Sequence, residues 1–302
     1  MQHEPAIGTC PKCCQCTKPT KLPGPRVSIS AGSDPLLSDS DAVVAYDATF
    51  KWEKSISLAW VQADVATRRI IEDALDFGVK TGIAFLETHG LQVRQGDRRV
   101  AGEGMWAVHY RLTTNRNLEP QLHDHVVIAN ISATADGETR TIAARSLFTH
   151  ATTAGHLAGQ AVRHELTKQL GYAWGPVVNG TCDLAGVPEV AMRIMSTRSR
   201  EVKELAEVYG GSQQARRIAA LTTRNRKEDP AEREVLEQKW RAQLDYYGFS
   251  AADEQALRHQ QTVAQRTPNR CDELFDHLGS PAGVTRLNAT FDRNTVIREV
   301  IA

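Results

Sequence analysis

The chain has 302 residues, of which 41% are hydrophobic, and it is therefore long enough to bury a sizeable core. It carries 36 Lys and Arg against 36 Asp and Glu, a formal net charge of zero, so any surface for nucleic acid must be local. No stretch approaches the roughly 18 consecutive apolar residues of a membrane helix, and the N-terminal residues lack the layout of a secretion signal. We therefore expect a globular, cytoplasmic protein with no membrane partner.

Residues 1–41 are rich in Cys, Pro, Lys, Gly and Ser and show almost no apolar periodicity, which predicts a disordered tail. Six cysteines in the whole chain are too few for a disulfide framework, so reduced thiols are expected. Four of them crowd into the tail and could offer thiolates to zinc, but no second Cys-x-x-Cys half-site follows. An oxidation-prone tail is favoured over a zinc site at Cys10, Cys13, Cys14 and Cys16.

The segment 42–187 combines strand-like and helix-like patterns. Apolar residues recur at spacings of three and four over 63–89, and a second helical pattern over 152–170 closes at Gly171. Between and around them, β-branched and aromatic runs predict strands and a small hairpin, at 42–50, 91–94, 103–112, 121–131, 139–143 and 172–184. The sequence therefore predicts an α/β (α+β) fold, in which two long helices cover one face of a central, mostly antiparallel sheet.

From residue 188 onward the pattern is helical only. Helices are expected at 188–195, 197–209, 212–223, 230–247, 251–262 and 269–277. Residues 193–227 hold nine Lys or Arg and three Glu, a local net charge of +6. Such a basic segment suits a phosphate backbone, and an ordinary solvated helix face is the equally weighted alternative. The candidate DNA-binding residues are Arg193, Arg198, Arg200, Arg216, Arg217, Arg224, Arg226 and Lys227.

Two histidines in the expected strand 121–131 are the sharpest local feature. Side chains two apart in a strand project from one face, so His123 and His125 point the same way. Two imidazoles make half of a metal site, which usually needs a third protein ligand and open positions for water or substrate. By themselves such pairs are more often histidines of an ordinary sheet face.

Four stretches, in order along residues 42–250, closely resemble the relaxase domain of TrwC/TraI-type (MobF) conjugative relaxases, of the HUH endonuclease superfamily. They are Val44 to Trp60, Arg111 to His125, His164 to Trp174 and Ser196 to Val202. The resemblance implies single-stranded DNA at a plasmid transfer origin as partner. It also implies nicking by an N-terminal tyrosine that stays joined to the 5′ phosphate, and a divalent cation such as Mg or Mn that stabilises the anionic transition state.

Carried over residue by residue, the resemblance places His123 and His125 on the paired metal ligands. Asp47 falls on an acidic residue that either supports a histidine or accepts the proton of the tyrosine. The first metal histidine of the family falls on Leu112, which has no lone pair, so the metal is doubtful here. His109 is near, but its parity in the strand is opposite to that of Leu112, and only a β-bulge could turn it toward the metal.

The ends of the chain also depart from the family. No tyrosine precedes Tyr46, and the tyrosines from Tyr46 onward lie in elements expected to be structural. Residues 281–302 are expected to be a truncated start of the segment that leads to a helicase in the family, and no Walker-type motif follows. We expect a relaxase-like domain that binds single-stranded DNA in conjugation, is impaired in nicking, and contacts other conjugation proteins. The alternatives are an active nickase with an unidentified nucleophile and a decayed gene product without a role.

Overall fold

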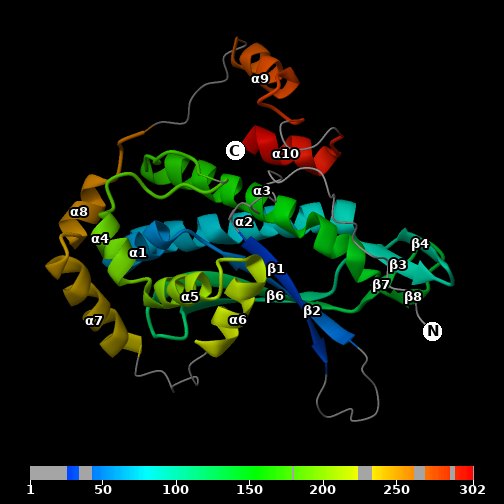
Figure 1. Cartoon of the computed structure of the whole chain (residues 1–302), viewed down its shortest axis with the longest axis horizontal. Helices are drawn as coiled ribbons and strands as arrows, with labels where there is room; N and C mark the ends of the chain where they lie inside the picture. The colour runs from blue at the N-terminus through cyan, green and yellow to red at the C-terminus, as the bar shows by residue number, and fades with distance from the viewer. Residues whose placement is uncertain are drawn as a thin grey trace.

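The computed structural model describes residues 26–33, 43–178, 180–223, 233–261, 269–285 and 290–301 (Figure 1). Its centre is a four-stranded sheet in which every neighbouring pair of strands is antiparallel. The strand order is β1 (Arg26–Ser33), β2 (Val43–Lys51), β6 (Pro120–Ala129) and β5 (Ala107–Thr114). The strand with the two histidines is β6, which lies between β2 and β5 as predicted.

The two faces of this sheet differ because side chains alternate along each strand. On β6, Leu122, Asp124, Val126 and Ile128 are buried, and the residues between them are partly exposed. The buried face is covered by helices. The opposite face of β6 carries the histidines and stays accessible to solvent.

Helices α2 (Val65–Gly90) and α3 (Ala144–Leu170) run side by side over the buried face (Figure 1). Glycines let them approach closely, since a Cβ at Gly78 would lie 2.4 Å from the side chain of Val162 on α3. A Cβ at Gly82 would lie 2.5 Å from the ring of Phe50 on β2. The prediction of a mostly antiparallel sheet with two long helices on one face is confirmed.

Helix α1 (Lys54–Gln62) was not predicted from the sequence. Every residue from Ser55 to Gln62 is buried, so the helix has no polar face and no amphipathic period that could reveal it. The start of α3 predicted from the sequence lies eight residues after the start that the structure shows. No side chain caps its N-terminus at Ala143, and the usual signal for a helix start is therefore missing.

The prediction of a structureless tail over residues 1–41 is wrong for β1, which pairs with β2 along its whole length. Within it, Val27, Ile29 and Ala31 alternate with serines, which is the pattern of a strand, but the Pro- and Ser-rich surroundings obscured it. The cysteines at 10–16 lie outside the described residues, so the expectations for them stay predictions.

Two short hairpins extend the fold at one end of the molecule (Figure 1). They are β3 (Gln92–Gln95) with β4 (Arg98–Ala101), and β7 (Ile131–Ala133) with β8 (Thr139–Thr141). The predicted strand 121–131 is thus divided between β6 and β7. No helix in the described residues is long and apolar enough to cross a membrane.

The described elements after Pro188 are all helices, as predicted. The last of them, α10, lies in the stretch 281–302 and was not predicted from the sequence. The helices are α4 (Glu189–Ile194), α5 (Thr197–Val208), α6 (Gln213–Thr222), α7 (Arg233–Tyr246), α8 (Ala251–Ala256), α9 (Asn269–Gly279) and α10 (Arg293–Ile301).

Candidate functional site

The sequence-predicted residues Asp47, His123 and His125 meet on the open face of the sheet. In the register of β2 and β6, His125 pairs with Thr49. Asp47 lies two residues before Thr49 on β2 and therefore on the same face of the sheet. The Nδ1 atom of His125 lies 2.8 Å from one carboxylate oxygen of Asp47 and 2.9 Å from the other. The rings of His123 and His125 have their centroids 5.2 Å apart. The three residues therefore form one constellation.

The hydrogen bonds of the two imidazoles fix which nitrogen is free. Nδ1 of His123 lies 2.9 Å from the backbone carbonyl oxygen of Gln121, and Nδ1 of His125 faces the Asp47 carboxylate. A carbonyl and a carboxylate can only accept, so each Nδ1 donates, and each neutral ring keeps its Nε2 lone pair. Metal-binding histidines commonly donate their second ring nitrogen to such acceptors. Of the two roles left open for Asp47, the geometry favours support of a histidine.

Burial strengthens the ligand character of His123. Desolvation lowers the pKa of its imidazole, and the nearby charges of His125 and Lys51 lower it further against the raising effect of its bond to Gln121. At neutral pH the ring is therefore uncharged, which is the form that binds metal ions.

The third position does not fit a metal. Leu112 pairs directly with His123 across β5 and β6, and its side chain is 41% exposed on the same face as the imidazoles. The register is regular from Ala107 to Leu112, so no bulge turns His109 toward that face. The nitrogen Nε2 of His109 instead lies 2.8 Å from Asp124 on the buried face. Among the described residues, the open face thus supplies two imidazoles and no third histidine, which leaves a metal ion one ligand short.

Tyr110 also lies on this face, and it is one of the tyrosines expected from the sequence to lie in structural elements. Its ring stacks on His125 with 5.1 Å between centroids and 9° between planes, and the side chain is 44% exposed. Tyr110 is thus exposed on the open face, whereas Tyr46 is buried on the opposite face. The spacing of Tyr110 from Leu112 could have identified Tyr110 as a residue of this face, because the two residues lie two apart on β5.

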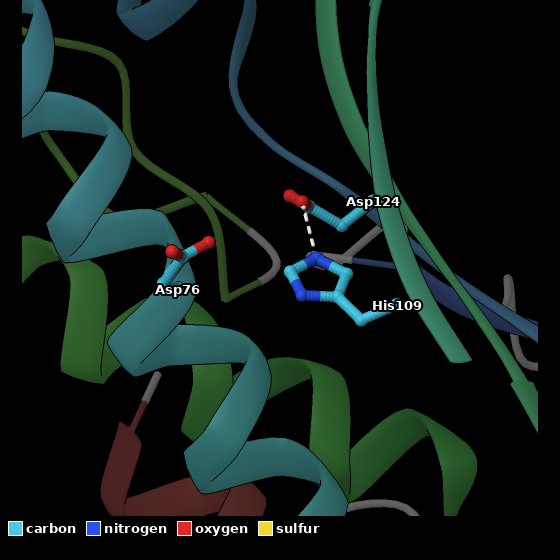
Figure 2. A group of neighbouring side chains, drawn as sticks. All are labelled: Asp76, His109 and Asp124. Carbon is cyan, nitrogen blue, oxygen red and sulfur yellow. Dashed lines mark hydrogen bonds and ion pairs between the residues drawn. The ribbon is translucent and has the colours of Figure 1, made fainter. Parts of the chain in front are cut away.

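A second cluster of potential ligands lies between the sheet and α2. Figure 2 shows Asp76 on α2 facing His109 and Asp124, and their ligand atoms all lie within 4.8 Å of one another. Asp124 is fully buried and accepts from Nε of Arg111 at 2.9 Å and from the indole of Trp52 at 2.5 Å. Arg111 also binds Asp76 at 2.6 Å. Because a guanidinium already fills the space between the two carboxylates, this cluster is an ion-pair network that joins α2 to the sheet.

The basic residues of the helical extension are divided by the structure. Arg193, Arg216 and Arg217 are exposed, as a phosphate-binding role requires. Arg198 is partly buried and donates to the carbonyls of Ala220 and Thr223 at the end of α6, where it holds α5 and α6 together. The others are Arg200, whose Nε lies 3.8 Å from Glu204, and Arg224, Arg226 and Lys227, which lie outside the described residues.

Known proteins agree with this fold. Residues 9–247 match the TrwC relaxase family. The multifunctional conjugation protein TraI of Escherichia coli is 31% identical over 277 residues, which are 85% of this chain and 15% of TraI. TraI of strain K12 is 32% identical over 232 residues, 70% of this chain and 12% of that protein. The chain therefore spans less than a fifth of these relatives.

Solved structures of the conjugative relaxase TrwC bound to transfer-origin (oriT) DNA are also similar. A copper-bound complex superimposes with a TM-score of 0.64 at 26% identity, and covers 70% of this chain and 74% of that one. A complex with a 27-mer DNA that contains the recognition hairpin and the cleavage site gives 0.64 at 27% identity, with 70% and 77% covered. With the family match over residues 9–247, these likenesses show that the chain belongs to the TrwC relaxase family.

Proposed function

We propose that this chain binds single-stranded DNA of a plasmid transfer origin and holds it against the open face of the sheet, but does not nick it. The observation that carries the proposal is the constellation of Asp47, His123 and His125 with Leu112 in the third position. The similar TrwC structures contain transfer-origin DNA, which supports the same class of partner here. The protein would act in the cytoplasm, beside other conjugation proteins.

Two features support DNA binding, one on the open face of the sheet and one on the helices after Pro188. The exposed ring of Tyr110 offers a surface on which a base can stack, and such stacking is tolerant of sequence. The exposed arginines Arg193, Arg216 and Arg217 would neutralise phosphates. Two imidazoles would hold Mg²⁺ or Mn²⁺ weakly, because loss of a ligand removes both a bond and preorganisation.

A metal-dependent nickase is the second candidate function, and the position of Tyr110 favours it. An exposed tyrosine hydroxyl on the face of the imidazoles is the kind of group that could attack a phosphodiester, with the 3′ oxygen of the cleaved strand as the leaving group. Tyr46 and Tyr172 are buried and do not share that exposure, and Tyr172 donates a hydrogen bond to Glu254.

The experiment combines binding and cleavage. Fluorescence anisotropy with a short labelled oligothymidylate should show binding whose affinity falls as salt rises. A denaturing gel with labelled origin DNA and Mn²⁺ should show neither a nicked product nor a covalent adduct. Binding that is absent at low salt would refute the DNA-binding proposal. A metal-dependent adduct that Tyr110→Phe abolishes would establish the nickase instead.

A further inference from the structure

A hollow of about 240 Å³ lies where the β3–β4 hairpin meets the N-terminus of α3, at the end of the molecule that carries the two small hairpins (Figure 1). Four arginines line it: Arg94, Arg98 and Arg99 from the hairpin and Arg145 from α3. We call this hollow the arginine pocket. Among the described residues that line it, Asp97 is the one acidic residue, so the four arginines and Asp97 together carry a charge of +3.

The arginines of the arginine pocket are not neutralised by the protein. All four are exposed, and among the described residues none of their guanidinium groups donates a hydrogen bond or forms an ion pair. Arg94 and Arg99 are also direct cross-strand partners in the β3–β4 ladder. Like charges in directly opposed positions destabilise a hairpin. The arrangement is therefore unfavourable for folding alone, and it becomes favourable when an anion lies between the two side chains.

The start of α3 adds to the same field. Ala143 and Ala144 line the arginine pocket, and no side chain caps this end of the 27-residue helix. The N–H groups of Ala143 and Ser146 donate to backbone carbonyls, which leaves those of Ala144 and Arg145 as donors at this end, and the helix dipole favours negative charge there. Arginine forks and a helix N-terminus are the two features that bind phosphate oxygens best in proteins.

The size and lining of the arginine pocket define its ligand. Its volume is below the roughly 300–1,000 Å³ of pockets that enclose whole small molecules. No aromatic side chain lines it, so it offers no surface for stacking a base. These features fit a phosphate group that belongs to a larger molecule lying across the rim.

We propose that the arginine pocket is a second anion site of this protein and binds a backbone phosphate of the DNA strand, independently of its sequence. The DNA occupant rests on the proposed function, and the phosphate chemistry does not. The site lies apart from the imidazoles, and phosphate contacts of this kind set the position and register of a nucleic acid and leave base recognition to other residues.

The test uses the full chain and the double variant Arg94→Gln/Arg99→Gln, with Arg69→Gln as matched control. Arg69 is an exposed arginine of α2 that does not line the arginine pocket. The affinity for a labelled oligothymidylate is measured against salt. The slope of log affinity against log salt should become shallower by about 0.7 for one lost phosphate contact in the double variant, and should not change in the control. The melting temperature of the double variant should stay the same or rise, because the like-charge pair is gone. A purely structural role of these arginines would lower it.

Pyrophosphate tests phosphate binding in the arginine pocket without DNA, so it distinguishes failure of this site from failure of the proposed function. It should raise the melting temperature of the unmodified chain and of Arg69→Gln, and should not raise that of Arg94→Gln/Arg99→Gln. No pyrophosphate effect together with an unchanged salt slope overturns the site. Pyrophosphate stabilisation with an unchanged slope overturns DNA as its occupant and establishes a site for free phosphate. If the unmodified chain binds no DNA but loses its pyrophosphate response in the double variant, the phosphate site stands and the proposed function fails.

Discussion

Leu112→His should convert the open face of the sheet into a metal site. The change restores a third imidazole at a position that pairs directly with His123, where side chains of an antiparallel pair have their Cβ atoms about 4.5–5.5 Å apart. The two existing imidazoles, those of His123 and His125, are already oriented, since Gln121 and Asp47 hold their Nδ1 atoms. The new ring therefore meets two preorganised ligands.

The magnitude follows from this preorganisation and from the exposure of Leu112. We expect Mn²⁺ to bind on the order of 10- to 100-fold more tightly, which corresponds to about 1.4–2.8 kcal/mol. Full burial of a leucine is worth about 1.5–3 kcal/mol, and Leu112 is 41% exposed, so its replacement costs at most about 2 kcal/mol of stability. The gain in metal affinity should thus appear in a folded protein.

Isothermal titration calorimetry with Mn²⁺ checks this expectation. Leu112→Phe is the matched control, because it places a ring without a lone pair at the same position. Leu112→His/His123→Ala should return the affinity to that of the unmodified chain. Equal Mn²⁺ affinities of Leu112→His and Leu112→Phe would refute the argument that the open face lacks one ligand.

Three further changes test other parts of the structure. Arg216→Glu/Arg217→Glu should weaken binding of an oligothymidylate and flatten its salt dependence, because each lost phosphate contact reduces the slope of log affinity against log salt by about 0.7. An unchanged slope in anisotropy titrations would show that α6 is not part of the DNA-binding surface. Arg111→Met should lower the free energy of unfolding by about 3 kcal/mol in urea titrations, because it leaves the fully buried carboxylate of Asp124 without its guanidinium; a loss below about 1 kcal/mol would contradict the network. Burial raises the pKa of Glu53 to about 7 from its ordinary 4.5, so folding favours the protonated acid. The contribution of the Glu53 carboxyl to the free energy of unfolding is fully present below about pH 4.5 and is lost as pH rises through 7. The total loss is about 3 kcal/mol. Glu53→Gln should remove that loss, and identical pH profiles of urea midpoints for both proteins would refute it.

Elements in which buried and accessible residues alternate could be predicted from the sequence. Elements whose residues are all buried could not. Strand β6 alternates strictly between buried and accessible residues, so the shared face of His123 and His125 was correctly derived from parity. Helix α1 has no exposed face, and its residues show no amphipathic period. Strand β1 has a strand pattern, but only eight residues of it, surrounded by tail-like composition.

The candidate site was predictable where it depended on one strand and unpredictable where it depended on distant contacts. The register of β5 against β6 shows that Leu112 lies beside His123 on the face of the imidazoles, as the resemblance to the family implied. The bonds of Arg198 to the end of α6 depend on how two helices pack, which no local pattern reveals. The same holds for the four arginines around the α3 terminus, because two elements far apart in the sequence bring them together.

The two faces of β6 explain how this family fold can persist without the complete ligand set. Residues on the covered face, such as Asp124, are bound by several groups from other elements, so a change there removes buried hydrogen bonds and costs stability. Residues on the open face, such as Leu112, keep much of their surface in water, and a change there costs little. Folding therefore constrains the even-numbered side chains of β6 more strongly than the accessible positions around the imidazoles. Leu112, which lies on β5 beside His123, is one of these less constrained positions.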